Sequence, residues 1–415
     1  MICSVYQNEG GVRMKRLTTK QKNEKLVTEG KKLHHYGLRF RALPTPSQLE
    51  KINQFIGSSR FAFNFYLKER QNVYRSTKES LSVNTFKKSF NSFKQHPSFS
   101  WLKQVDKFAL ESAIESVEDA FKRFFNGQNK FPRLKKKHKS KQSYTTKLTN
   151  NNIELDIENR AIKLPKLGWV KTRFSKSLRD NFVLKGRVLS ATVTRHSSGE
   201  VFISLKMEDV IDLQEKQVIS SISDKDILGC DMGLLHFLIT SKGDKIENSR
   251  YLKNNLRKLA SLQRKLRNKR VGSSNYKKAQ QSISKLHLHI ANMRKDFLHK
   301  VSRKLVNENQ VIVLEDLNVK NMIQNKRLAR SIADVGWGMF KTFITYKANW
   351  ANKYVVLVDT FFPSSKMCHG CKEKHTLLSL SERVWVCPKC GIEHDRDENA
   401  AQNIKEEGKR ILLSS

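Results

Sequence analysis

The chain has 415 residues, with 79 Lys and Arg against 39 Asp and Glu, which gives a formal net charge of +40 at pH 7. This length exceeds one ordinary hydrophobic core, so about two to four structural units are expected. A charge surplus of this size favours nucleic acid as the partner over an anionic membrane surface. Runs of about 18 apolar residues and an apolar leader are both missing, which excludes a membrane span and predicts a cytoplasmic protein.

The first part of the chain is polar and basic, and a helical region follows it. Residues 1–33 lack a sustained apolar period and are expected to form a loose basic arm or a short helix. Alternating side chains over 33–43 predict a strand. Ser47 and Glu50 have the spacing of a capping box, which predicts a helix from about residue 48 and helical structure to about residue 126.

Aromatic and basic side chains of this region each allow two interpretations. Phe86, Phe90 and Phe93 recur at helical spacing, and core packing is favoured over base stacking. The segment 133–147 contains seven Lys and Arg residues and no acid, and phosphate contact is favoured over a solvated loop. Tyr144 within it offers a ring on which a base could stack.

Short strands then dominate residues 153–208, and the sequence HSSGE at 196–200 predicts a hairpin turn between the last two. The strand at 33–43 can join them. We therefore expect a small β-barrel into which the helical region is inserted.

The second half alternates strands with helices. Residues 227–248 predict a three-stranded meander, and two long helices with leucine-rich seams follow, separated by a break at 271–274. The simplest interpretation of the seams is an antiparallel helical hairpin. Apolar strands are expected at 311–319 and 354–359, and a final helix from about residue 396.

Two close cysteine pairs stand near the C-terminus: Cys368 with Cys371, and Cys387 with Cys390. This spacing is typical of a zinc ribbon, in which four thiolates close a tetrahedral Zn²⁺ site and leave no position for catalysis. The strand RVWVC (383–387) is expected to deliver the third thiolate. The neighbouring histidines are expected at the surface: His369, His375 and His394.

Three carboxylates occupy unusual positions. Asp231 lies within an otherwise apolar strand and Glu315 ends another, where a charge is costly unless it is paired, hydrated or bound to a metal. Asp397 opens the last helix, whereas Asp395 is expected to point elsewhere and Asp316 to be structural. Acids that converge from two strands and a helix suit two Mg²⁺ ions acting on a phosphodiester.

These motifs carry a family resemblance. The segments GCDMGLLHFLITSKGD, VIVLEDLNVKNM, SSKMCHGC with CPKCG, and HDRDENAAQNI occur in this order. The chain resembles TnpB, the RNA-guided nuclease family of bacterial and archaeal insertion sequences, which is related to the compact type V CRISPR effectors. The resemblance covers residues from about 33 to 410.

The resemblance implies a role for each acid and a set of ligands. Asp231 matches the first acid of a split RuvC nuclease, Glu315 the second, and Asp397, in the D-x-N-A pattern, the third. It further implies catalytic Mg²⁺, structural Zn²⁺, a guide RNA from the element's own transcript, and a target DNA that carries a short adjacent motif. The oligomeric state is left open.

The expected fold is multidomain α+β: a β-barrel with a helical insertion, an RNase H-like (RuvC) α/β nuclease domain, and an inserted zinc ribbon. The expected ranges are 1–33 for the basic arm, 34–47 and 133–220 for the barrel, 48–132 for the helical insertion, 225–365 and 392–415 for the nuclease domain, and 366–391 for the ribbon.

The favoured function is an RNA-guided DNA endonuclease. Two alternatives come from other classes: a guided DNA-binding regulator that does not cut, and an accessory protein of transposition. A CRISPR-guided relative is a close variant. The intact set of three acids argues against the non-cutting alternative.

Overall fold

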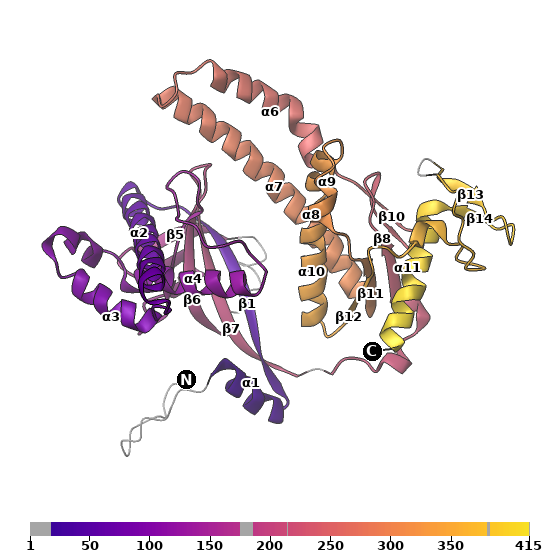
Figure 1. Cartoon of the computed structure of the whole chain (residues 1–415), viewed down its shortest axis with the longest axis horizontal. Coiled ribbons are helices and arrows are strands. Elements are labelled where there is room, and N and C mark those ends of the chain that lie inside the picture. Colours follow the sequence, from indigo (N-terminus) through magenta and orange to yellow (C-terminus); the bar gives the residue numbers. More distant parts are fainter. Residues whose placement is uncertain (1–17, 175–185, 214, 380–381, 415) are drawn as a thin grey trace. The chain divides into compact units, whose positions relative to one another are not determined.

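The polypeptide divides into two compact units, Met1–Leu213 and Gln214–Ser415, which are described separately (Figure 1). The computed structural model describes residues 18–174, 186–213, 215–379 and 382–414. Residues 1–17 of the predicted basic arm lie outside these ranges. The rest of that arm is ordered, because helix α1 (Thr19–Thr28) begins with a capping box between Thr18 and Gln21 and a strand follows from Lys31.

A seven-stranded sheet forms the centre of the first unit, with the order β2-β6-β7-β1-β5-β4-β3. Its strands are β1 (Lys31–Ala42), β2 (Gln142–Lys147), β3 (Glu154–Asp156), β4 (Ala161–Leu164), β5 (Gly168–Arg173), β6 (Arg187–Arg195) and β7 (Val201–Asp212). The turn predicted at 196–200 is confirmed by the His196 amide, which donates to the Glu200 carbonyl at 2.8 Å. The strands β2 and β5 were not predicted, because outward-facing polar residues hide their alternation.

Helices α2 (Pro46–Thr77) and α4 (Lys107–Phe125) pack against this sheet, and α3 (Val83–Phe93) packs on α4. The short 3₁₀ helix η1 (Pro97–Gln104) joins α3 to α4. The predicted capping box at Ser47 and Glu50 is wrong. The structure uses Thr45 as the N-cap and Gln48 as its partner. The reason is Pro46, whose fixed φ and missing N–H favour the first helical position, so the cap lies directly before it.

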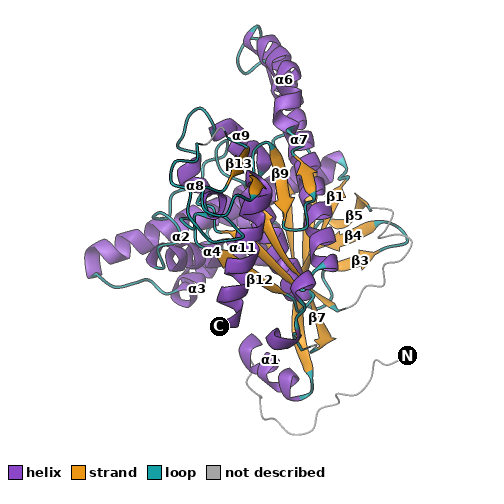
Figure 2. Ribbon diagram, turned by 90° about the vertical axis from the view of Figure 1, so that its right-hand side faces the viewer, coloured by secondary structure: helices purple, strands orange, loops and turns teal. Residues whose placement is uncertain are grey.

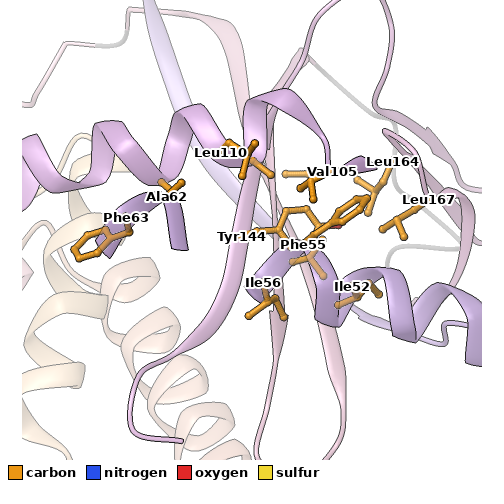
Figure 3. Packing of buried hydrophobic residues seen from close by; sticks show 14 of the residues in the cluster. Ile52, Phe55, Ile56, Ala62, Phe63, Val105, Leu110, Tyr144, Leu164 and Leu167 are labelled. Carbon is orange, nitrogen blue, oxygen red and sulfur yellow. The ribbon is translucent and has the colours of Figure 1, made fainter. Parts of the chain in front are cut away.

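The core of the first unit lies between α2, α4 and the sheet (Figure 3). Phe86 and Phe90 are buried in it and Phe93 packs against it, which confirms core packing. The stacking role considered for Tyr144 is wrong. Its side chain is only 3 % exposed and meets Phe55 edge-on, with 5.4 Å between ring centroids, because this strand position faces inward.

The second unit contains a five-stranded sheet of order β10-β9-β8-β11-β12. Its strands are β8 (Ile227–Asp231), β9 (His236–Thr240), β10 (Lys245–Glu247), β11 (Val311–Glu315) and β12 (Tyr354–Val358). Strands β8, β9 and β10 form the predicted antiparallel meander, whereas β11 runs parallel to β8 and to β12. A separate hairpin is made by β13 (Val384–Val386) and β14 (Glu393–Asp395).

Helices cover both faces of the five-stranded sheet. They are α6 (Tyr251–Arg267), α7 (Ser274–Glu308), α8 (Val319–Met322), α9 (Ala329–Val335), α10 (Trp337–Trp350) and α11 (Arg396–Leu413). Ile312 and Leu314 of β11 face α7 and α10, while Val311 and Val313 face α11. This burial on both sides explains why the strand reads as a continuous apolar run. The predicted hairpin is confirmed by α6 and α7, which extend beyond the strands (Figure 2).

Two glycines allow α11 to lie directly on the sheet. A Cβ added to Gly229 of β8 would meet the backbone carbonyl of Ala401 and stand 2.6 Å from the backbone nitrogen of Lys405. A Cβ added to Gly408 of α11 would stand 2.9 Å from the Cβ of Val313 and nearer still to its two methyl groups. The helix therefore approaches β8 and β11 more closely than any larger residue would permit.

None of the helices in the described ranges combines the length and apolar character needed to cross a bilayer.

We predict that Gly408→Ala lowers the free energy of unfolding by about 1–3 kcal/mol, because the added methyl group has no space against Val313. Gly338→Ala in α10 is the matched control. Its Cβ would meet nothing within 4 Å, so the same change should stabilise the helix by up to about 1 kcal/mol. Urea unfolding followed by circular dichroism measures both, and equal midpoints for the two variants would contradict the close packing.

Candidate active site and cysteine cluster

The three predicted acids lie at the ends of elements that meet at one edge of the five-stranded sheet. Asp231 is the last residue of β8 and Glu315 the last residue of β11. The two strands are parallel neighbours in which Cys230 pairs with Leu314, so the acids occupy the next positions side by side. Asp397 lies in the first turn of α11, which packs on β8. Carboxyl ends of adjacent parallel strands commonly form functional sites.

Electrostatics shows that these carboxylates act on one another. Burial, followed by the negative charges of Glu315 and Asp397, raises the pKa of Asp231 to about 8. Burial also raises the pKa of Glu315, although a hydrogen bond from Ser364 opposes the rise. Arg396 and Arg383 supply too little positive charge to restore the usual pKa of Asp231. The site therefore has an excess of negative charge that a cation would neutralise.

Two of the acids have partners that orient them. The Ser364 hydroxyl donates to Glu315 at 2.6 Å. The Arg383 guanidinium lies 3.2 Å from Asp397. In the described part of the chain, the three carboxylates are not drawn into a tight group like that of the cysteines.

The neighbouring acids point away, as the sequence indicated. Asp395 is the N-cap of α11 and accepts from the backbone amides of Asp397 and Glu398. Its other oxygen binds Lys245 at 2.8 Å. Asp316 binds Lys341 at 2.5 Å. Asp395 thus fixes the start of the helix that carries Asp397, and Asp316 is engaged by a lysine of α10.

The four cysteines come together. One ligand atom from each of Cys368, Cys371, Cys387 and Cys390 lies within 4.8 Å of all the others. The Sγ atoms of Cys368 and Cys390 are 3.6 Å apart, as are those of Cys371 and Cys387. The hairpin β13–β14 supports the second pair. Four thiols in this arrangement could hold a metal ion and leave no open ligand position.

The surface position predicted for His394 is wrong. Its side chain is 4 % exposed, and its Nε2 lies 3.1 Å from the Sγ of Cys368. Its ring also packs on Trp385 at 4.7 Å between centroids. The reason is strand alternation: in β14 the flanking Glu393 and Asp395 are more exposed, so His394 points into the cluster. His369 is exposed and His375 is half-buried.

Two asparagines join α11 to the cysteine region, and sequence reasoning missed both. Asn399 donates to the Met367 carbonyl at 2.8 Å and accepts from the His369 amide at 2.9 Å. Asn403 donates to the carbonyl of Ser364 at 2.9 Å. The signal was their spacing of four residues in NAAQN, which puts both amides on one helix face.

Three family models match parts of the chain. "Cas12f1-like, TNB domain" matches residues 337–404, "Probable transposase" matches 213–326, and "Helix-turn-helix domain" matches 35–79. The last description does not fit the local structure, because residues 35–79 form most of β1 and the single helix α2.

Two solved structures have a similar fold. The Cas12f1 chain of a Cas12f1–sgRNA–target DNA complex superimposes with a TM-score of 0.54 at 12 % identity, covering 91 % of this chain and 99 % of that one. The mini-RNA-guided endonuclease CRISPR-Cas_phi3 gives 0.50 at 9 % identity, covering 97 % and 98 %. At these identities the likeness concerns the fold alone.

Two curated bacterial relatives match over most of their length. A "Putative RNA-guided DNA endonuclease" of Streptomyces pristinaespiralis is 32 % identical over 369 residues, which are 88 % of this chain and 87 % of that protein. InsQ of Escherichia coli K12, which carries the same description, is 29 % identical over 389 residues, covering 90 % and 92 %. Three mimivirus relatives are named TnpB-like proteins. The identity and coverage place this chain in the TnpB family of insertion-sequence proteins, to which its ordered acid and cysteine motifs also point.

Proposed function

We propose that this chain is an RNA-guided DNA endonuclease of a transposable element, which cuts DNA that pairs with its bound guide RNA. The single observation that carries the proposal is the junction of Asp231, Glu315 and Asp397, where charges from two strands and a helix act on one another. Its relatives are named for this activity. The charge of +40 supports two nucleic-acid partners, a guide RNA and a target DNA.

The donor set of the acid site fits Mg²⁺, because hard divalent cations prefer carboxylate oxygens. Asp231, Glu315 and Asp397 would hold two such ions. When bound, they would stabilise the negative charge that develops on a hydrolysed phosphodiester and make a water molecule more nucleophilic.

The protein groups around the site prepare these ligands. The Ser364 hydroxyl keeps one oxygen of Glu315 in place and leaves the other free to bind. Asp395, held by Lys245, caps α11 and so positions Asp397 one residue into that helix. Arg383 neutralises Asp397 while no cation does so.

The cysteine cluster would hold a structural Zn²⁺ ion, because four thiolates form a closed tetrahedral site. The cluster lies close to Asp397 in the sequence, and helix α11 connects the two. Asn399 and Asn403 bind the chain that enters the cluster, at Met367 and Ser364, from the same helix that carries Asp397. A folded cluster would thus keep Ser364 on Glu315.

We assign the domains as follows. The five-stranded sheet, with one parallel and one antiparallel half and helices on both faces, supports an RNase H-like nuclease domain over 225–365 and 392–415. The seven-stranded sheet supports the barrel with its helical insertion at 48–132. In that sheet β1 pairs with β7 along its whole length and with β5 at Arg41 and Ala42, so this strand, which precedes the helical insertion, is joined to strands that follow it. The ribbon would occupy 366–391.

We predict that Asp231→Ala lowers DNA cleavage by on the order of 10³-fold or more while guide-directed DNA binding is retained, because the lost carboxylate would hold the catalytic cations and not the DNA. Asp316→Ala is the matched control, since this acid also follows β11 but binds Lys341. Cleavage of a DNA duplex and binding of the same duplex are measured in parallel. Full cleavage by Asp231→Ala would refute the assignment, and guided binding without any cleavage by the parent would favour a regulator.

We predict about one zinc ion per chain, and we expect Cys387→Ser to lose it and to expose residues around 366–391 to proteolysis, because metal binding and local folding are one equilibrium. Lys389→Ala is the control, because this residue stands next to Cys390 but binds Glu373 at the surface. Elemental analysis and limited chymotrypsin digestion provide the measurements, because chymotrypsin does not cleave at the lysine that the control replaces. If the parent protein without zinc gave the same digestion pattern as the parent with zinc, a structural role of the metal would be excluded.

A further inference from the structure

A cavity of about 160 Å³ lies in the first unit between α2, α4 and β2. Its walls include Arg60, Lys135, Lys141, Ser112 and Tyr144, and Figure 3 shows Tyr144 beside Phe55 in the core. A second cavity, of about 290 Å³, adjoins it. The two share Ile56 and Arg60 as common wall residues.

Both cavities are lined by cations and by no acid. Arg60, Lys135 and Lys141 line the first, and Lys137 and Arg195 join Arg60 in the second. None of these five side chains forms an ion pair with any described residue. Glu115 of α4 is already bound by Lys87 and Lys147.

Lys135 is held in place although its charge has no counter-ion. Its backbone amide and carbonyl bind the side chain of Asn64 at 2.8 and 3.0 Å. Its Nζ stands 3.7 Å from the ring centroid of Phe63, and burial lowers the pKa of this lysine to about 8. A desolvated cation without an anion destabilises a fold, so its retention calls for a ligand of opposite charge.

A hydroxyl in the same wall also lacks a partner. The Oγ of Ser112 on α4 is buried and makes no hydrogen bond with any described residue. Buried hydroxyls are almost always hydrogen-bonded in proteins, so an unpartnered one beside a cationic cavity indicates a missing acceptor. Phosphate oxygens are acceptors that bind both hydroxyls and guanidinium groups.

We propose that the two cavities bind successive phosphate groups of one nucleic-acid strand, with Arg60 between them, Lys135 and the Ser112 hydroxyl on the first phosphate, and Lys137 and Arg195 on the second. The strand is supplied by the guide RNA or the target DNA, so the proposal rests on the proposed function. The single large ring in the walls, Tyr144, is packed in the core, so the site recognises backbone and not base sequence.

The proposal separates the residues of the basic run 133–147. Lys135 and Lys137 line the cavities, whereas Lys136 and Lys139 are exposed and line neither. Two double variants with equal loss of charge therefore test it: Arg60→Gln with Lys135→Met, and Lys136→Gln with Lys139→Gln as the control. Gln is polar like the Arg60 side chain that donates to Gln142 but has no charge, and Met has an unbranched chain that can pack on Phe63 as Lys135 does.

The RNA that copurifies with the parent protein is extracted and added back to each variant. Its dissociation constant is measured at several salt concentrations, first with RNA alone and then with the matching DNA present. Arg60→Gln with Lys135→Met should lower the salt slope by roughly 1.4, and the control by less than half of this, because each single-strand phosphate contact contributes about 0.7. A change with RNA alone identifies the guide as the strand, and a change only with DNA present identifies the target. Equal slopes for the two double variants in both arms would overturn the proposal.

Ser112→Ala gives an independent test. It should weaken binding by roughly 10-fold without changing the salt slope, because a neutral donor to a charged acceptor is lost. Without nucleic acid, Arg60→Gln with Lys135→Met should melt no lower than the parent, since it removes unpaired cations. If the first double variant melted at a lower temperature and bound RNA like the parent, these residues would be structural. Inorganic phosphate should compete with RNA for the site, and equal competition in the parent and both double variants would also refute it.

These assays do not use cleavage, so they separate the two proposals. A parent chain that binds RNA with the expected variant slopes but cuts no DNA would contradict the proposed function and support the phosphate site. If the parent cut DNA normally and the two double variants had equal salt slopes for RNA binding, the proposed function would be supported and the phosphate site refuted.

Discussion

The close packing of α11 on the five-stranded sheet is the constraint on which the candidate active site depends. Gly229 and Gly408 remove the side chains that would hold the helix away from β8 and β11. The same helix carries Asp397 at its start and Asn399 and Asn403 on the face that binds the cysteine region. One close contact therefore sets the position of the third acid and of the segment that holds Ser364 against the second.

The molecule leaves charges of both signs without partners, in different places. The pKa of Asp231 is unusually high because burial, followed by the negative charges of Glu315 and Asp397, disfavours its ionised form. Lys135 loses its proton more readily than usual because burial removes its water. Neither arrangement benefits the fold by itself, since an unpaired buried charge destabilises it. Both are understandable as sites whose stabilising partner is a ligand, a cation in one and a phosphate in the other.

Much of the fold was readable from local pattern. Apolar runs with acids at their ends predicted β8 and β11, the leucine seams predicted the α6–α7 hairpin, and the two Cys-x-x-Cys pairs predicted the cluster. The apolar runs and leucine seams repeat one residue type many times, and the cysteine pairs have a spacing that few other structures share. The order of the strands, with β11 between β8 and β12, was not readable, because pairing between distant segments leaves no local pattern.

Sequence alone determined the residue types at the site and their family resemblance, since the acids and cysteines follow one another in a specific order. Tertiary structure alone decided which polar residues are buried. Tyr144 belongs to the core, His394 to the cysteine cluster and Lys135 to a cavity wall, although each stands in a polar stretch. The physical reason is that burial depends on what packs against a face from elsewhere in the chain, which the hydrophobicity of the neighbours along the sequence does not report.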